Sequence, residues 1–329
     1  MSATEYEARR EGDSFLYLWH ALGLGIAFDQ LQEDRWGLYG EMQVRTTQVM
    51  PATGRPGHVY QSRFNLSSGP DRDKLAVTLS KRDDRKPWRD LIEIACTETL
   101  RLYREGEPIV DLRDTKVTPQ KHLIERLLPL GETSVLYGDG ASAKSFLALA
   151  CGVAARTGIP IGPFRATQQA GVLYLDWETT AEEQRERLGR ICAGLGVEVP
   201  MIHYRPMWRA LAEDSQYLRT EVDKLGVGLV IVDSIAPAVG GDVDSAGVIS
   251  FFNGLRSFGS EVTRLVLSHV SKQVREQEHG LGDPFGSVFV LNFARSAWAV
   301  QRTTEAGGEA IEVGLFHRKV NRGPQQQPS

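Results

Sequence analysis

Long apolar runs and cysteines are both scarce in this sequence. No stretch approaches the roughly 20 consecutive apolar residues that a membrane-spanning helix needs. The 329 residues include only three cysteines, Cys96, Cys151 and Cys192, and these lie too far apart to form a CxxC pair or a thiolate metal site. No basic segment followed by an apolar one opens the chain, so we expect no signal peptide. These absences predict a cytoplasmic protein without a disulfide framework and without a membrane partner.

An excess of charge of one sign is also missing. Charged residues make up 24% of the chain, hydrophobic residues make up 41%, and the formal net charge is only −4. This composition is typical of a soluble protein with a packed core, and it provides no general attraction to nucleic acid or anionic membranes. Any contact with nucleic acid must therefore come from a local group of basic residues.

Turn-forming residues divide the chain into parts. Gly106, Pro108 and Pro119 interrupt the patterned sequence near residues 106–120. We therefore expect a small α+β domain over residues 1–110 and a second domain over residues 111–324. Residues 325–329 are polar and rich in glutamine and proline, which predicts a disordered tail.

The first domain is expected to combine helices with strands. An amphipathic pattern predicts a helix over Ser14–Gly23, and a second helix over Pro87–Glu105 begins at a proline and ends before Gly106. Four strands are predicted between them: Gly25–Gln32, Leu38–Thr47, Val59–Leu66 and Leu75–Ser80. Basic residues on these strands leave two interpretations open, a nucleic-acid surface and a solvated sheet face. The role of this domain is not readable from its sequence.

The second domain alternates short apolar strands with helices. The predicted strands are Ser134–Tyr137, Gly171–Leu175, Leu229–Val232 and Arg264–Leu267. The predicted helices are Ser145–Arg156, Ala181–Gly194, Asp214–Leu225 and Asp244–Gly259, and strands at Ser296–Gln301 and Ala310–Phe316 follow. Apolar strands alternating with helices indicate a mainly parallel sheet that is covered on both faces, which is an α/β fold.

A loop of small residues between a strand and a helix predicts a phosphate-binding site. Its Lys-Ser pair, Lys144 and Ser145, stands where the helix begins, which is the context such a loop requires. Main-chain N–H groups bind the phosphates, Lys144 reaches the β- and γ-phosphates, and Ser145 is a ligand of Mg²⁺. The residues expected to bind ATP are Gly138, Asp139, Gly140, Ala141, Ser142, Ala143, Lys144, Ser145 and Phe146. The alternative is a small-residue turn with a solvated lysine.

The loop departs from the usual pattern at Ala143, where a phosphate-binding loop has a glycine. If this position requires a positive φ angle, an alanine there adds a strain of roughly 1–2 kcal/mol. Nucleotide binding would then be weaker, and the rate of hydrolysis is harder to predict than binding.

Two apolar strands end in acidic residues. Asp233 follows a strand downstream of the loop and is expected to hold the Mg²⁺ shell opposite Ser145, although an aspartate at this place can also simply cap the next turn. Glu178 follows the intervening strand and is expected to accept a proton from the water that attacks the γ-phosphate. Alternatively, Asp176 or Glu178 begins the acidic first turn of the next helix.

Polar residues also end the strand that precedes residue 270. Ser268 and His269 are candidates for sensing the γ-phosphate, and a plain surface histidine is the alternative. The segment that follows is long, polar and glycine-rich, and long loops of this kind in compact domains are frequently functional.

These features together resemble the RecA-like P-loop ATPases, and most closely the branch of plasmid RepA-type hexameric helicases. The resemblance covers roughly residues 120–324, and it includes the stretches Leu127–Thr133, Phe146–Gly158 and Val172–Glu178. It implies a RecA-like core that binds ATP between subunits of a ring, a hexamer in that branch, or of a filament.

The resemblance also implies that one subunit completes the site of the next. Arg295 matches the region that supplies an arginine finger, and Lys319 resembles a late basic motif that approaches the neighbour's γ-phosphate. A cation inserted in this way offsets charge that builds up during phosphoryl transfer. The alternative for Arg318, Lys319 and Arg322 is a basic terminus that only adds solubility.

In RecA-like rings, the loop that corresponds to the segment after His269 faces the central channel and holds single-stranded DNA. Lys272 and Arg275 are therefore the candidates for phosphate contacts. Glu276 and Glu278 oppose this assignment, and the segment has no aromatic residue for base stacking.

The sequence thus predicts an oligomeric ATPase with ATP and Mg²⁺ as cofactors and single-stranded DNA as partner. It would act as a helicase-like motor or clamp in replication or recombination. A nucleotide-binding regulator or assembly scaffold with little hydrolysis is the first alternative, motivated by Ala143 and the acidic pI. A recombination mediator that forms filaments on DNA is the second.

Overall fold

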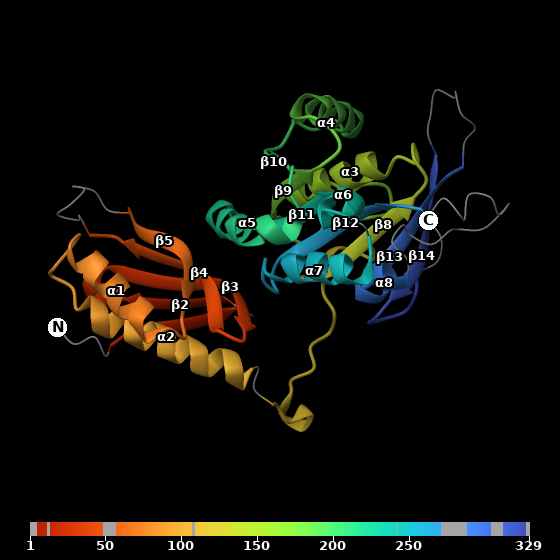
Figure 1. Ribbon diagram of the computed structural model, residues 1–329. Helices are drawn as coiled ribbons and strands as arrows, with labels where there is room; N and C mark the ends of the chain where they lie inside the picture. The colour runs from red at the N-terminus through yellow and green to blue at the C-terminus, as the bar shows by residue number, and fades with distance from the viewer. Residues whose placement is uncertain are drawn as a thin grey trace. The chain divides into compact units, whose positions relative to one another are not determined.

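The computed structural model describes residues 5–11, 14–48, 57–106, 109–241, 243–270, 288–303 and 312–326. The chain forms two compact units, Met1–Val117 and Thr118–Ser329 (Figure 1). Each unit has its own main sheet and its own hydrophobic core. In the described part of the chain, no helix has the length and apolar character needed to cross a membrane.

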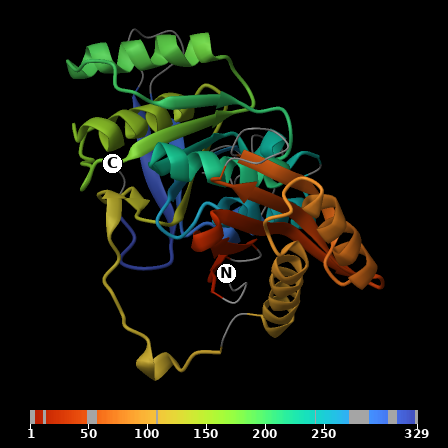
Figure 2. The same ribbon diagram turned by 90° about the vertical axis from the view of Figure 1, so that its left-hand side faces the viewer.

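The first unit is an antiparallel sheet with helices on one face. Its five strands pair in chain order and are β1 Glu7–Glu11, β2 Ser14–Trp19, β3 Leu24–Asp34, β4 Gly37–Thr46 and β5 Gly57–Asn65. The helices α1 (Gly69–Ser80) and α2 (Trp88–Glu105) lie against the sheet (Figure 2). They contribute Leu79 and Trp88 to the core, which also contains Trp19 of β2. A 3-10 helix over His20–Leu22 connects β2 to β3, and another lies at Leu112–Asp114.

Two predicted elements of this unit are wrong. The stretch predicted as a helix over Ser14–Gly23 is strand β2 followed by the 3-10 turn, because its aromatic residues are buried at every second position. The stretch predicted as a strand over Leu75–Ser80 is the second half of α1. The Ser68 side chain caps that helix by accepting a hydrogen bond from the Asp71 N–H group.

The second unit contains a seven-stranded sheet with the order β10-β9-β11-β12-β8-β13-β14. Its strands are β8 Thr133–Gly138, β9 Gly171–Asp176, β10 His203–Pro206, β11 Val227–Asp233, β12 Thr263–His269, β13 Ser296–Arg302 and β14 Val313–Val320. Only β14 pairs antiparallel with its neighbour, and the other pairs are parallel. The short strands β6 (His122–Ile124) and β7 (Leu128–Pro129) form a small sheet of their own.

Helices cover both faces of this sheet (Figure 1). On one face, α3 (Lys144–Thr157) and α4 (Ala181–Leu195) join the core. The other face packs against α5 Leu211–Leu225, α6 Ile235–Val239, α7 Ser245–Arg256 and α8 Val288–Phe293. The predicted fold class is confirmed in its architecture, because this unit is an α/β domain with a mainly parallel sheet and follows a smaller α+β unit.

The strand order determines which loops meet. The carboxyl ends of β8, β9, β11 and β12 lie at one edge of the sheet because these strands are parallel. At that edge, His269 of β12 is paired with Gly138 of β8, and Asp233 of β11 is paired with Asp176 of β9. The segments that the sequence identifies as functional therefore leave the sheet side by side.

Candidate nucleotide-binding site

The loop predicted to bind phosphate connects β8 to α3 at this carboxyl edge. Strand β8 is buried along its whole length, and α3 begins at Lys144, so the N–H groups of the first helical turn face the loop. At the start of the loop, a Cβ on Gly138 would lie 2.2 Å from the carbonyl oxygen of Val300. Only glycine fits at this position, which lets the chain leave the sheet close to β13.

The side chain of Lys144 folds back over the loop and is buried. Its Nζ donates hydrogen bonds to the carbonyl oxygens of Gly138, at 2.9 Å, and Asp139, at 2.6 Å. The hydroxyl of Ser142, which is also buried, lies 3.4 Å from the same nitrogen. A cation is thus held at the centre of the loop, where an anionic ligand would meet it.

Two alanines of the loop have left-handed backbone conformations. Ala143 has a φ angle of +65°, so this position does require positive φ, and Ala141 has a φ angle of +61°. Each adds a strain of roughly 1–2 kcal/mol relative to glycine. The sequence indicated the strain at Ala143, but Ala141 was missed because nothing in the residue type marks that position.

The hydroxyl of Ser145 lies close enough to the carboxylate of Asp233 to lower its pKa. The carboxylate accepts a hydrogen bond from the buried Tyr174 hydroxyl, with 2.7 Å between Tyr174 Oη and Asp233 Oδ2. Burial raises the pKa of Asp233, and Tyr174 and Ser145 partly oppose that shift. The two residues expected to flank a metal ion therefore lie near each other.

A hydroxyl oxygen and a carboxylate at the mouth of a phosphate loop fit a magnesium ion. Mg²⁺ prefers hard oxygen ligands and is usually held by one or two protein groups together with phosphate oxygens and water. Ser145 and Asp233 supply such oxygens beside the buried cation of Lys144.

Glu178 lies between the ends of β9, β11 and β12. One carboxylate oxygen accepts a short hydrogen bond from the hydroxyl of Ser234 and lies 3.5 Å from Nε2 of His269. The hydrogen bond from His269 is the main reason that the pKa of Glu178 is lowered, and Ser234 and the charge of Lys144 add to the effect. The carboxylate is therefore ionised at neutral pH and lies near enough to Lys144 to interact with its charge.

Glu178 does not belong to the helix that follows it. Helix α4 begins at Ala181 and is capped by Thr180. Asp176 instead serves the turn: its carboxylate accepts hydrogen bonds from the main-chain N–H groups of Glu178 and Thr179 and from Gln184. The alternative that Asp176 or Glu178 begins the acidic first turn of α4 is therefore wrong for both residues. Asp176 stabilises the turn before the helix.

The two candidate sensors differ in their surroundings. Ser268 is fully buried, and its hydroxyl donates to the carbonyl oxygen of His269 at 3.2 Å. The His269 side chain is 40% exposed and contacts Glu178. His269, but not Ser268, therefore has a side chain in contact with the group that is expected to act on water.

Arg295 and Lys319 lie away from the phosphate loop of their own chain. The main-chain N–H group of Arg295 donates to the carbonyl oxygen of Thr133, at the start of β8. Nε of its half-exposed side chain lies 3.7 Å from Oε2 of Glu132. Nζ of Lys319 donates to the carbonyl oxygens of Leu291 and Asn292. Burial and the charge of Arg295 lower the pKa of Lys319. Both cations belong to the amino edge of β8 and β13, opposite the loop.

Phe146, Lys272 and Arg275 are the remaining residues predicted to contact nucleotide or nucleic acid. Phe146 follows Ser145 at the surface, and the Arg187 guanidinium carbon lies 5.9 Å from the centroid of its ring. Lys272 and Arg275 lie outside the described residues. At the C-terminus, the main-chain N–H group of Gln326 donates to Nδ1 of His317.

Sequence reasoning missed Tyr174 and Ser234, which contact Asp233 and Glu178. A signal for Tyr174 existed, since it is the one polar-tipped side chain in the buried run Val172–Leu175, and a buried tyrosine hydroxyl needs a partner. Ser234 directly follows the acid of β11, but its residue type alone does not distinguish it from a helix cap.

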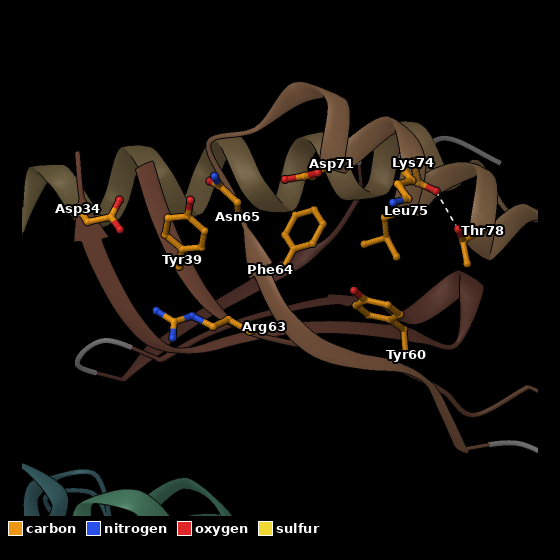
Figure 3. A pocket seen from close by; sticks show the side chains of 10 residues that line it. All are labelled: Asp34, Tyr39, Tyr60, Arg63, Phe64, Asn65, Asp71, Lys74, Leu75 and Thr78. Carbon is orange, nitrogen blue, oxygen red and sulfur yellow. Dashed lines mark hydrogen bonds between the residues drawn. The ribbon is translucent and has the colours of Figure 1, made fainter. Parts of the chain in front are cut away.

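The first unit contains a separate pocket of about 580 Å³ between β5 and α1 (Figure 3). Its walls carry the aromatic residues Tyr39, Tyr60 and Phe64. The lining also includes two cations and two acids, Arg63, Lys74, Asp34 and Asp71. Because these charges balance, the pocket has no electrostatic preference for an anion, and it shares no residue with the nucleotide site.

Comparison with known protein families matches the middle of the chain, from within α2 to a point beyond β12. Residues 99–275 match the AAA domain family, a range that includes Lys144, Glu178 and Asp233 and ends before Arg295. Among solved structures, the chain is similar to the KaiC-like protein PH0186 from the hyperthermophilic archaeon Pyrococcus horikoshii OT3. The two are 14% identical with a TM-score of 0.43, over 63% of this chain and 87% of that chain. No curated protein matches.

The family match, the phosphate loop and the sheet order describe the same part of the molecule. The match spans more than half of the 329 residues and contains every residue of the loop. The chain belongs to the AAA domain family.

Proposed function

We propose that this chain binds and hydrolyses ATP at the carboxyl edge of the second sheet, and that it works as an oligomer on DNA. The observation that carries the proposal is the buried Lys144, held over the loop that ends at Ser145, with Asp233 close to the Ser145 hydroxyl. A hydroxyl, a carboxylate and a cation at a helix N-terminus form an arrangement suited to a nucleoside triphosphate with a divalent metal.

The loop would bind the triphosphate tail. Main-chain N–H groups of Gly138–Ser145 and the start of α3 attract the phosphate oxygens, and Lys144 would exchange its bonds to loop carbonyl oxygens for phosphate contacts. Ser145 and Asp233 would hold Mg²⁺. When bound, the ion neutralises negative charge on the phosphate oxygens.

Glu178 would act as the general base. Its lowered pKa means that the carboxylate stays ionised as the pH falls toward the usual carboxyl range. Contacts with Ser234 and His269 restrict the carboxylate to one orientation, so it can accept a proton from an attacking water. We therefore expect Glu178 to become protonated, and hydrolysis to be lost, only at a pH below the ordinary titration range of a glutamate.

Arg295 and Lys319 support an oligomer. They lie at the amino edge of the sheet, whereas the loop lies at the carboxyl edge, and six residues of β8 separate the two edges by roughly 20 Å. They cannot reach their own loop, so a role in hydrolysis requires the site of a neighbouring subunit. A ring, with six subunits as in the RepA-type branch, or a filament would provide that arrangement.

DNA as the partner rests on the resemblance to the RepA-type helicase branch of RecA-like ATPases, with Lys272 and Arg275 as candidate contacts. A specific observation favours the alternative of a regulator with little hydrolysis, namely the positive φ angles at both Ala141 and Ala143. Strain in the loop would weaken its grip on the phosphates without removing the site.

Release of phosphate from ATP, with and without single-stranded DNA, tests the proposal. We expect the wild-type protein to release phosphate faster when DNA is present, and Lys144→Ala to lose most of this activity. Hydrolysis that is unchanged in Lys144→Ala would refute the site. Tight ATP binding without turnover, even with DNA, would favour the regulator.

A further inference from the structure

Two exposed aromatic residues and two arginines lie at the end of β10 and on the segment from there into α5 of the second unit. Trp208 is 89% exposed, and Tyr217 on α5 is 55% exposed. The Arg205 guanidinium carbon lies 4.5 Å from the centroid of the Tyr217 ring, and Arg209 follows Trp208. We call these four residues the Trp208 surface. A tryptophan this exposed contributes little to the fold and is available for a partner.

The Trp208 surface places two arginines around one buried carboxylate. Nη2 of Arg209 lies 2.8 Å from Asp214 Oδ1, and Nη2 of Arg205 lies 3.9 Å from Asp214 Oδ2. One buried carboxylate therefore holds two guanidinium groups, and the charge of one arginine is not balanced by it. Glu213, the other acid in the first turn of α5, is exposed to solvent, so the two arginines and the two acids together leave no net charge.

The segment that carries Trp208 is hydrogen-bonded to the segment that carries Glu178. The Met207 N–H group donates to the carbonyl oxygen of Asp176 at 2.8 Å. The indole nitrogen of Trp177 donates to the carbonyl oxygen of Arg209 at 2.9 Å. Because Trp177 directly precedes Glu178, a ligand that moves residues 207–209 would also move the proposed general base.

We propose that the Trp208 surface binds single-stranded nucleic acid and transmits binding to Glu178. This inference rests on the proposed function and adds a contact site to it. Exposed rings offer stacking platforms for bases, and arginines offer charge to the phosphate backbone. The Trp208 surface has two exposed aromatic rings, whereas the sequence around Lys272 and Arg275 has no aromatic residue.

A nucleic acid fits this surface better than a second protein. Docking against an apolar protein face would remove two guanidinium groups from water with only Asp214 to compensate them. A polyanion instead brings its own negative charge to the arginines. The carboxyl edge of the sheet also carries both this surface and the nucleotide site, which keeps the ligand close to Glu178.

Fluorescence anisotropy with a fluorescein-labelled oligo(dT) tests binding. We expect Trp208→Ala to weaken binding by about tenfold or more, because one stacked base is lost. Trp36→Ala is the matched control, since Trp36 is 68% exposed in a turn of the first unit and should leave affinity unchanged. Arg209→Gln should reduce the dependence of affinity on salt by the equivalent of about one phosphate contact.

Phosphate release with the same oligonucleotide tests the connection to Glu178. Trp208→Ala should lose the stimulation of phosphate release by DNA that the wild-type protein shows. Unchanged oligo(dT) affinity in Trp208→Ala would overturn the inference. So would dissociation of the oligomer with unchanged affinity, because that outcome assigns the surface to a subunit contact. Absence of ATP hydrolysis in the wild-type protein would contradict the proposed function. Binding of nucleic acid to the Trp208 surface is tested separately, by the oligo(dT) affinity measured in the anisotropy experiment.

Discussion

Tyr174 fixes one oxygen of the acid that is expected to face the metal. Its hydroxyl donates to Asp233 Oδ2, while its ring stacks on that of Tyr204, with 6.4 Å between centroids. Hydrogen bonds to a ligating carboxylate orient it and tune its affinity for the metal. Tyr174 is therefore a positioning residue that acts through Asp233.

Tyr174→Phe removes this hydrogen bond and keeps the ring. Because the Asp233 carboxylate is then less firmly oriented, we expect Mg²⁺ to bind about 10–100-fold more weakly in the presence of ATP. The measurement is the Mg²⁺ concentration that gives half of the maximal rate of hydrolysis. Tyr204→Phe is the control, since the Tyr204 hydroxyl donates to the Thr179 carbonyl oxygen rather than to Asp233. Equal Mg²⁺ dependence in the two variants would contradict this role.

Some residues of the site could be predicted from the sequence, and others could not. Lys144, Ser145 and Asp233 follow from residue type and order, because a phosphate loop requires a Lys-Ser pair before a helix and an acid after a later strand. The left-handed conformation of Ala141 does not follow, since alanine carries no mark of positive φ.

At the scale of elements, prediction succeeded where one periodicity dominated. The strands of the parallel sheet are continuous apolar runs between helical segments, so β8, β9, β11 and β12 were predicted close to their observed bounds. Strand β2 was predicted as a helix because Leu16 and Leu18 make both faces of the strand apolar, and this hides the alternation. Helix α1 was missed because Ser68 and Pro70 also suit a turn.

The turn that enters β8 offers a test of how closely its elements are packed. Gly131 has a φ angle of +73°, and a Cβ there would lie 2.1 Å from the carbonyl oxygen of Ser260. We expect Gly131→Ala to lower the free energy of unfolding of the second unit by roughly 2–4 kcal/mol, through backbone strain and overpacking. Urea denaturation measures this change.

Gly158→Ala is the matched control for that experiment. Gly158 has a φ angle of +80°, but its Cβ would meet only Gln169, at 3.8 Å. The backbone cost alone should be about 1–2 kcal/mol. Equal losses in the two variants would show that the contact with Ser260 does not constrain the turn.

At the scale of the whole molecule, the position of Arg295 and Lys319 distinguishes action on their own subunit's nucleotide site from action on a neighbouring subunit's site. Strand β13 is parallel to β8, and Ser296 is paired with Ser134, so Arg295 lies beside the beginning of β8 and not its end. The resemblance predicted these cations from sequence, but only the strand register shows that their own loop is out of reach.

Mixed oligomers test this geometry. Lys144→Ala and Arg295→Ala should each be inactive alone, because one lacks the loop cation and the other lacks the finger. If Arg295 acts on a neighbouring subunit, an equal mixture that reassembles at random should regain about a quarter of the wild-type activity. The rate of phosphate release after mixing and reassembly is the measurement. No recovery, with mixed oligomers demonstrated by mass, would contradict action between subunits.

The proposed ATPase function requires that Ser145 and Asp233 form a metal site beside a bound triphosphate. Calorimetric titration of ATP with and without Mg²⁺, on the wild-type protein and on Ser145→Ala, measures this most directly. We predict that Mg²⁺ strengthens ATP binding to the wild-type protein and that Ser145→Ala loses most of this gain. If Mg²⁺ strengthens ATP binding equally in both proteins, the assignment of the site is wrong.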